Sequence, residues 1–216
     1  MDINAIVQNI SVWIIPVLFA ITVHEASHAY AAKFFGDKTA QMLGRTTLNP
    51  TKHIDPIGTI LVPLLAIIVG NVIIGWAKPV PVNTRNLQNP KTNMRWVALA
   101  GPISNLLMAL FWAITIWLTI NVFINTSFSE FFIKVGAAGI SINIMLFVFN
   151  LLPIPPLDGA KVVESILPHN LAVKYNQLEQ YGMFIIIGLF FIGFLGQILD
   201  PIRSSISKII YNLIGI

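Results

Sequence analysis

The sequence predicts an all-α polytopic membrane protein with about four transmembrane helices, and two observations support this fold class. First, 56% of the 216 residues are hydrophobic, only 10% are charged and the mean hydropathy is +0.77. Soluble domains carry roughly a quarter charged residues, so this composition excludes an ordinary soluble domain. Second, apolar runs recur along the chain, most of them long enough to span a bilayer: about 4–32, 57–76, 96–124, 131–152 and 183–199.

The first apolar run predicts a helix over residues 4–35 that is retained, and not a signal peptide. Asp2 precedes it without any Lys or Arg, and no small-residue cleavage site is evident. The first basic residues come at or directly after the end of this helix: Lys33, Lys38, Arg45 and Lys52. By the positive-inside rule, the N-terminus lies outside and residues 36–56 lie in the cytoplasm. The basic loops therefore indicate membrane orientation, and not nucleic-acid binding, despite a pI near 9.5.

Residues 41–56 mix Thr, Gly, Asn and Pro with few apolar positions, which predicts short β-strands and turns. The next run, 57–76, either crosses the membrane or enters and returns. Crossing divides the 13 Lys and Arg residues almost evenly between the two sides, whereas return places most of them inside. The positive-inside rule therefore favours a re-entrant segment.

The stretch 75–83 reads GWAKPVPVN and has proline at alternate positions, which excludes a central strand but permits an edge strand. In an extended chain these prolines block one edge. The other edge keeps its pairing groups at Lys78, Val80 and Val82. Such an open edge can pair with another extended segment by strand addition.

With a re-entrant 57–76, helix 96–124 runs outward and helix 131–152 runs inward. Prolines at 153, 155 and 156 end the inward helix and place Asp158 on irregular backbone, near the cytoplasmic side. Residues 84–95 are expected to form a polar, basic connector. Residues 160–180 are expected in the cytoplasm, helix 181–199 returns outward, and 200–216 forms a tail along the interface.

The first helix contains the sequence His-Glu-x-x-His. His24 and His28 lie one helical turn apart on one face, which suits two ligands of one Zn²⁺, and Glu25 is then directed toward a metal-bound water. A zinc hydrolase takes three protein ligands, and Asp158 is the acidic residue placed at the right depth by a helix break. The alternatives are a polar packing network or a proton relay at 24–28, and a simple turn residue at 158.

Other polar residues have less specific interpretations. Small and polar residues in the stretch 100–105, including Asn105, are more often packing contacts between helices, as is Asn150. His53 is expected to form loop hydrogen bonds near the entrance of the site, and His169 to be an ordinary surface residue. The absence of cysteine excludes disulfides and thiolate zinc sites.

Together these motifs resemble the site-2 protease family, the intramembrane zinc metalloproteases. The resemblance is carried by HEASH at 24–28, AGPISN at 100–105, NLLPIPPLDG at 150–159, GRTTLNPTKHIDPIG at 44–58 and GWAKPVPVN at 75–83. It covers about residues 20–165 and is similar to the compact bacterial branch, since 216 residues leave no room for PDZ or CBS regulatory domains. Ser27 departs from the glycine that is common in the first motif.

The resemblance implies one Zn²⁺ per chain on His24, His28 and Asp158, with Glu25 as the catalytic base. It also implies that Asn105 and Asn150 handle substrate near the metal, and that the segment containing Lys78, Val80 and Val82 approaches the substrate. The expected organisation is a single membrane-embedded metalloprotease domain over 1–216, with a core at 4–159 and a C-terminal helix and tail at 181–216.

The resemblance further implies that the chain hydrolyses peptide bonds within or near transmembrane segments of membrane proteins, in the bacterial cytoplasmic membrane. The active site is then nearer the cytoplasmic face. Three other functions stay open: a non-proteolytic protein of the same fold that binds transmembrane helices, a transporter with a His/Glu relay, and an unrelated membrane zinc protease such as a prenyl-protein protease. The relay predicts no zinc, and the unrelated protease needs a different third ligand.

Overall fold

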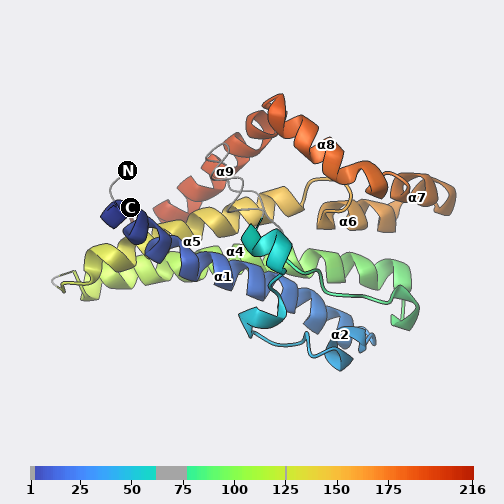
Figure 1. Cartoon of the computed structure of the whole chain (residues 1–216), viewed down its shortest axis with the longest axis horizontal. Helices are drawn as coiled ribbons and strands as arrows, with labels where there is room; N and C mark the ends of the chain where they lie inside the picture. Colours follow the sequence, from blue (N-terminus) through green and yellow to red (C-terminus); the bar gives the residue numbers. More distant parts are fainter. Residues whose placement is uncertain (1–2, 62–76, 125) are drawn as a thin grey trace.

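The structure is a computed structural model that describes residues 3–61, 77–124 and 126–216, and the regular elements of these residues are helical. Three helices are long and apolar enough to cross a membrane: α1 (Ile3–Phe34), α4 (Pro90–Val122) and α5 (Ser129–Asn150). They pack against one another as a bundle (Figure 1). The helices predicted at 4–35, 96–124 and 131–152 are thus confirmed.

The predicted β-strands are not found among the described residues. The segment after α1 instead forms α2 (Thr39–Met42), a 3₁₀ turn η1 (Pro50–Lys52) and the π-helical turn η2 (Pro56–Leu61). Its side chains favour turns: the Asn49 carboxamide oxygen accepts a hydrogen bond from the backbone N–H of Thr51 at 3.1 Å. Such local bonds compete with strand pairing. Most of the predicted re-entrant segment 57–76 lies outside the described residues.

Helix α4 begins earlier than the predicted residue 96. After the 3₁₀ turn η3 (Thr84–Asn86), Asn89 has an extended backbone and the helix starts at Pro90. Proline suits the first helical position because it lacks an N–H that would be unpaired there, and its φ is already helical. The prediction of a connector over the whole of 84–95 was therefore wrong, and the first turns of α4 are polar.

The C-terminal region also differs from the prediction. The polar segment after α5 forms α6 (Asp158–Ile166) and α7 (His169–Asn176). The single helix expected at 181–199 is instead two helices, α8 (Glu179–Phe191) and α9 (Phe194–Leu213), which meet at 80°. Gly193 lies at the break with a φ of +74°, a conformation that glycine adopts without steric cost. The predicted interfacial tail is part of α9.

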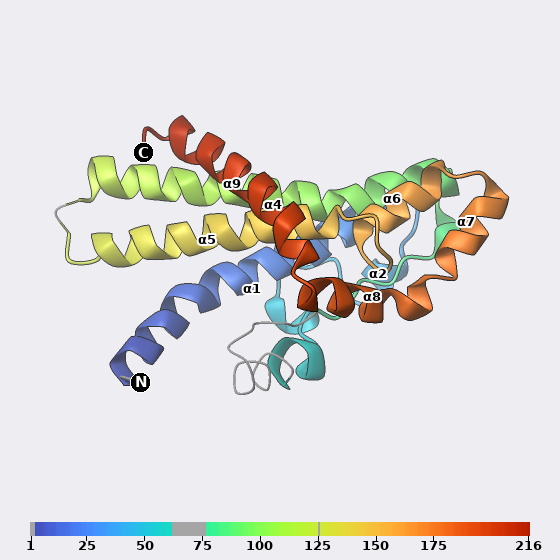
Figure 2. The same cartoon turned by 90° about the horizontal axis from the view of Figure 1, so that it is seen from above.

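Close packing of α4 and α5 forms the core that supports the site. A side chain at Gly139 of α5 would collide with the ring of Trp112, so the two helices approach at this small residue. Helix α9 adds Leu195 and Leu199 to the same core. Both termini and the α4–α5 connection lie at one end of the bundle, whereas α2, α6 and α7 lie at the other end (Figures 1 and 2).

Candidate metal centre

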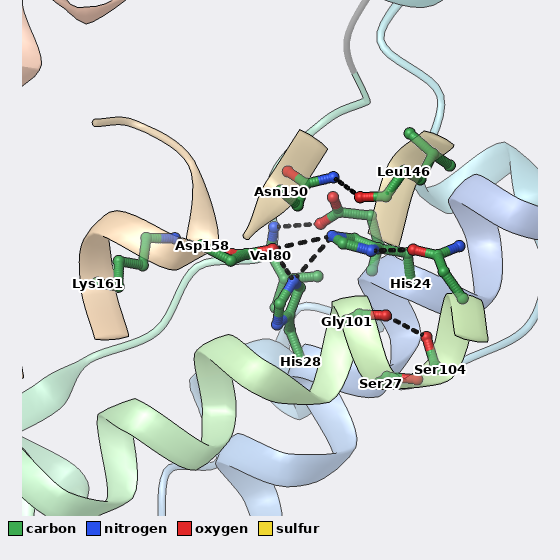
Figure 3. A network of polar contacts seen from close by, with 12 residues as sticks. His24, Ser27, His28, Val80, Gly101, Ser104, Leu146, Asn150, Asp158 and Lys161 are labelled. Carbon is green, nitrogen blue, oxygen red and sulfur yellow. Dashed lines mark hydrogen bonds and ion pairs between the residues drawn. The ribbon is translucent and has the colours of Figure 1, made fainter. Parts of the chain in front are cut away.

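Three ligand atoms from two distant parts of the chain converge near the C-terminal half of α1. The Nε2 atoms of His24 and His28 are 3.1 Å apart. Oδ2 of Asp158 lies 3.1 Å from Nε2 of His24 and 3.3 Å from Nε2 of His28. All three side chains are buried, and their potential ligand atoms lie within 4.8 Å of one another. Figure 3 shows them pointing toward one another from α1 and from the start of α6.

This triangle has the dimensions of a zinc site. With bonds of about 2.0–2.1 Å, ligand atoms at the corners of a tetrahedron are separated by roughly 3.3 Å. The observed separations of 3.1–3.3 Å match this value. Two imidazole nitrogens and one carboxylate oxygen are also a ligand set that Zn²⁺ accepts, and three protein ligands leave a fourth position open. The residues therefore fit the metal.

The ring of His28 is oriented by the backbone of α4. Its Nδ1 lies 2.7 Å from the carbonyl oxygen of Val97. A carbonyl only accepts hydrogen bonds, so Nδ1 carries the proton and Nε2 presents its lone pair to the metal position. This arrangement, in which the outer ring N–H of a histidine is held by a carbonyl, is typical of zinc ligands.

The ring of His24 is oriented by two buried amides. Nδ2 of Asn143 donates to the carbonyl of Gly139 at 2.9 Å, which leaves its Oδ1 to accept from Nδ2 of Asn105 at 2.9 Å. The same Nδ2 donates to the carbonyl of Ala20 at 3.2 Å. Oδ1 of Asn105 must therefore face Nδ1 of His24, which lies 2.6 Å away and donates to it. Nδ1 of His24 is thus occupied by this bond, and Nε2 is the nitrogen left to bind a metal.

The backbone of α4 passes directly against the two rings at Gly101. A Cβ at this position would collide with both His24 and His28. The small residue therefore provides the space that the imidazoles occupy. The AGPISN stretch thus serves the site twice, through Gly101 in front of the rings and Asn105 behind one of them.

Glu25 faces the extended segment that precedes η3. The backbone N–H of Val80 donates to Oε2 of Glu25 at 3.0 Å. Two residues before Val80, the N–H of Lys78 donates to the carbonyl of His53 at 2.9 Å. The carbonyl of Lys78 accepts a hydrogen bond from the Arg45 guanidinium. Two N–H groups of the edge that was expected to be open are thus bonded within the chain itself.

Some of the remaining predicted residues line the cavity beside the candidate metal site, and others lie away from it. Val80, Val82 and Asn150 line a cavity of about 130 Å³ together with the three ligands and Glu25. The Asn150 amide donates to the carbonyl of Leu146 at 3.0 Å. Asn105 is fully buried on the opposite side of His24 from the ligand position. His53 is also fully buried, with Nε2 2.8 Å from the carbonyl of Thr47, and so forms the loop contacts expected of it.

Sequence reasoning missed three residues at this site. Asn143 was detectable, because a lone amide in an apolar transmembrane run needs a partner. Val97 contributes only a carbonyl, which no side-chain pattern indicates. Lys161 lies one turn after Asp158, with Nζ 3.8 Å from Oδ1, and was hidden in a polar segment assigned to the cytoplasm.

The comparisons with known proteins agree with this chemistry. The profile of "Peptidase family M50" matches residues 12–134 and 118–193. The chain is 38% identical over 202 residues to "Putative zinc metalloprotease YwhC" of Bacillus subtilis, covering 91% of this chain and 89% of that protein. It is 31% identical over 175 residues to a protein of Mycolicibacterium smegmatis named Rip2 with the same description, covering 80% of this chain. No solved structure matches it significantly.

A second Rip2 protein, from Mycobacterium tuberculosis, is 28% identical over 174 residues. The chain spans 63% and 64% of the lengths of these two mycobacterial proteins, and so less than two thirds of each.

Proposed function

The chain belongs to peptidase family M50, and from this premise we propose that it is an intramembrane zinc endopeptidase. Its substrates are membrane proteins, which it cuts within or next to their transmembrane segments. The observation that carries the proposal is that His24 and His28, on a helix long enough to cross a bilayer, lie at tetrahedral spacing with the Asp158 carboxylate of α6. A hydrolytic site built on such a helix is within reach of substrates in the bilayer.

His24, His28 and Asp158 hold the metal, one ion per chain. When bound, Zn²⁺ supplies the Lewis acidity that polarises water and the scissile carbonyl. Glu25 removes a proton from the attacking water as the new C–O bond forms, and it later delivers that proton to the amine as the C–N bond breaks.

A substrate helix must be unwound before it can be cut, because its carbonyls are held in its own hydrogen bonds. We propose that the unwound strand pairs with the segment containing Lys78, Val80 and Val82. Pairing at Val80 requires its N–H to leave Glu25 and bind a substrate carbonyl. Pairing at Lys78 likewise requires its N–H to leave the carbonyl of His53. The exchange at Val80 releases a Glu25 oxygen for proton transfer, so substrate docking and activation of the base are coupled.

The two asparagines take different roles in this proposal. Asn150 lines the cavity with the ligands, and its amide is the group we assign to the developing oxyanion or to the freed substrate backbone. Asn105 acts behind His24, where it fixes the proton on Nδ1. Its effect on substrate is then indirect.

We propose that the protein lies in the bacterial cytoplasmic membrane with its site nearer the cytoplasmic face. The end of the bundle with α2, α6 and α7 is supported as this face by its basic loops, under the positive-inside rule (Figure 1). The surfaces of α1 and α4 that face away from the bundle expose large apolar side chains such as Trp13, Phe19 and Phe111, which suit contact with lipid.

The test is cleavage of a transmembrane helix by the purified protein in liposomes, with the zinc content of every sample measured. Glu25→Gln is expected to keep one zinc per chain and to lose roughly 100-fold to 10,000-fold in cleavage rate. Glu130→Gln is the matched control, because Glu130 is exposed at the other end of the bundle and pairs only with Lys134 among described residues. Equal cleavage by wild type and Glu25→Gln would contradict the proposal.

A further inference from the structure

A second and larger cavity adjoins the metal pocket at the end of the bundle that carries α6 and α7. It has a volume of about 640 Å³ and is bounded by α6, α7, the first turns of α4 and the connector before them. Figure 2 shows α6 and α7 beside the start of α4. The two cavities share Val82, Met94, Pro156, Leu157 and Lys161 as lining residues. We call this space the flank groove.

The walls of the flank groove are joined by specific contacts. Nζ of Lys91 donates to the carbonyl of Leu167 at 2.6 Å, which ties the start of α4 to the end of α6. The hydroxyl of Tyr175 donates to the carbonyl of Pro153 at 2.8 Å, which ties α7 to the proline-rich loop before Asp158. Gly182 of α8 lies so close to the Pro155 carbonyl that a Cβ there would collide with it. The groove is therefore built into the fold.

The two cavities differ in how much of a substrate each can hold. A volume of 130 Å³ holds about four water molecules, which is enough for the reacting atoms and too little for several residues of substrate. The flank groove lies within the range of about 300–1,000 Å³ that is typical of ligand sites. A cut chain that passes through the first cavity continues into the second.

Four charged side chains line the flank groove: Lys91, Lys161, Glu164 and Glu179. Its two lysines are engaged by the protein, Lys91 with a carbonyl and Lys161 with Asp158. Glu164 and Glu179 also line it, and among the described residues neither has a basic nitrogen within 4.0 Å. Burial and the charge of Glu179 raise the pKa of Glu164, and the charge of Lys161 offsets these effects only in part. A further cation between Glu164 and Glu179 would reduce the remaining repulsion between the two carboxylates.

We infer that the flank groove binds the extended polypeptide that flanks the substrate's transmembrane segment, and that Glu164 and Glu179 select flanks rich in Lys and Arg. Cytoplasmic flanks of transmembrane helices carry this excess of basic residues, which gives the groove a general and not a sequence-specific occupant. The inference rests on the proposed function for the occupant's identity. It adds a binding site and a substrate class to that function.

Binding is measured with full-length Glu25→Gln in nanodiscs of neutral phosphatidylcholine, so that neither cleavage nor anionic lipid contributes. The probes are three labelled peptides with one transmembrane helix and a Lys-Arg-Lys, Gln-Ser-Gln or Glu-Asp-Glu flank. Added Glu164→Gln and Glu179→Gln substitutions remove the two charges. Glu130→Gln is again the control, and one zinc per chain reports an intact site.

The parent is expected to bind the basic flank roughly threefold to tenfold more tightly than the neutral flank, with a preference that weakens as salt is added. The variant with both Glu164→Gln and Glu179→Gln is expected to bind the basic-flank and neutral-flank peptides with affinities within twofold of each other. Reversing both charges, Glu164→Lys and Glu179→Lys, is expected to make the acidic flank the tighter ligand. A parent without flank preference, or a zinc-loaded double variant with the parent's preference, overturns the inference.

The two proposals fail separately. Flank-selective binding by a protein whose wild type cuts no transmembrane helix contradicts the protease proposal and leaves the flank groove supported. Cleavage by the wild type without flank selectivity in binding contradicts the flank groove alone.

Discussion

Oδ1 of Asn105 accepts a hydrogen bond from Nδ1 of His24 at 2.6 Å, on the side of the imidazole opposite the ligand position. The orientation of this amide is fixed by Asn143 and ultimately by a backbone carbonyl of α5. The candidate metal ligand His24 on α1 is thus oriented by residues of α4 and α5, so the packing of three helices determines which ring nitrogen of His24 faces the ligand position.

The first prediction concerns this amide pair. Asn105→Ala is expected to weaken zinc binding by about 10-fold to 100-fold, the usual effect of removing a partner that orients a ligand. Asn143→Ala is expected to have a smaller effect in the same direction, because Asn105 keeps its bond to the Ala20 carbonyl. Zinc affinity is measured by competition with a chelator. Asn121→Ala is the control, because that amide is exposed on α4 and, within the described part of the chain, bonds only to its own helix.

The second prediction concerns the space in front of the rings. Gly101→Ala is expected to displace the imidazoles of His24 and His28. The free energy of unfolding is expected to fall by about 1–3 kcal/mol, as at other overpacked sites. Zinc content and cleavage are expected to fall together. Gly188→Ala is the matched control, since a Cβ added there meets no described atom within 4 Å. Normal zinc content in Gly101→Ala would show that the rings do not depend on this close approach.

The third prediction separates the backbone of residue 80 from its side chain. Val80→Pro removes the N–H that donates to Glu25 and is expected to reduce cleavage by roughly 10-fold to 100-fold at unchanged zinc content. Val80→Ala keeps the N–H and is expected to stay within a few-fold of wild type. Undiminished cleavage by a folded, zinc-loaded Val80→Pro would exclude both the strand-addition proposal and a positioning role for this bond.

The sequence pointed to the three residues that the structure brings together, His24, His28 and Asp158, because each has a local cause. Helical periodicity places His24 and His28 on one face, and the prolines before Asp158 end the helix where a third ligand is needed. The Asn105–Asn143 contact has no local cause, because it depends on the rotation of α4 against α5. Residues 41–56 were assigned to strands because turn-forming residues separate short β segments as readily as they link short helical turns.

The break between α8 and α9 was missed for a related reason. Glycine is common within transmembrane helices, so Gly193 in an apolar run did not by itself indicate a bend. The local sequence permits the left-handed conformation there, and the packing of Leu195 and Leu199 onto the α4–α5 core makes use of it. Composition therefore predicted the number of apolar segments better than it predicted their path.

Asp37 ties the end of α1 to the connector that carries Val80 and Val82. Its carboxylate accepts hydrogen bonds from the backbone N–H of Thr39 at 3.0 Å and of Asn83 at 2.7 Å, and from the Asn86 amide at 3.0 Å. Burial alone would raise the pKa of Asp37, but these bonds and that of the Thr39 hydroxyl outweigh it and lower the pKa below its ordinary value. The ionised form is thus the one that the fold stabilises.

The fourth prediction is a pH dependence with a fixed sign. Because the folded-state pKa lies below the unfolded value of about 3.9, the stabilisation is fully present above that value and is lost as the pH falls through the folded-state pKa. Asp37→Ala is expected to lower the free energy of unfolding at pH 7 by about 1–3 kcal/mol, and the gap to wild type is expected to narrow as the pH falls below about 3.9. Thermal unfolding in detergent across this pH range measures it. Asp200→Ala, at an exposed carboxylate on α9, is the control. A gap that stays constant from pH 7 to pH 2 would mean that the Asp37 charge does not hold the connector against α1.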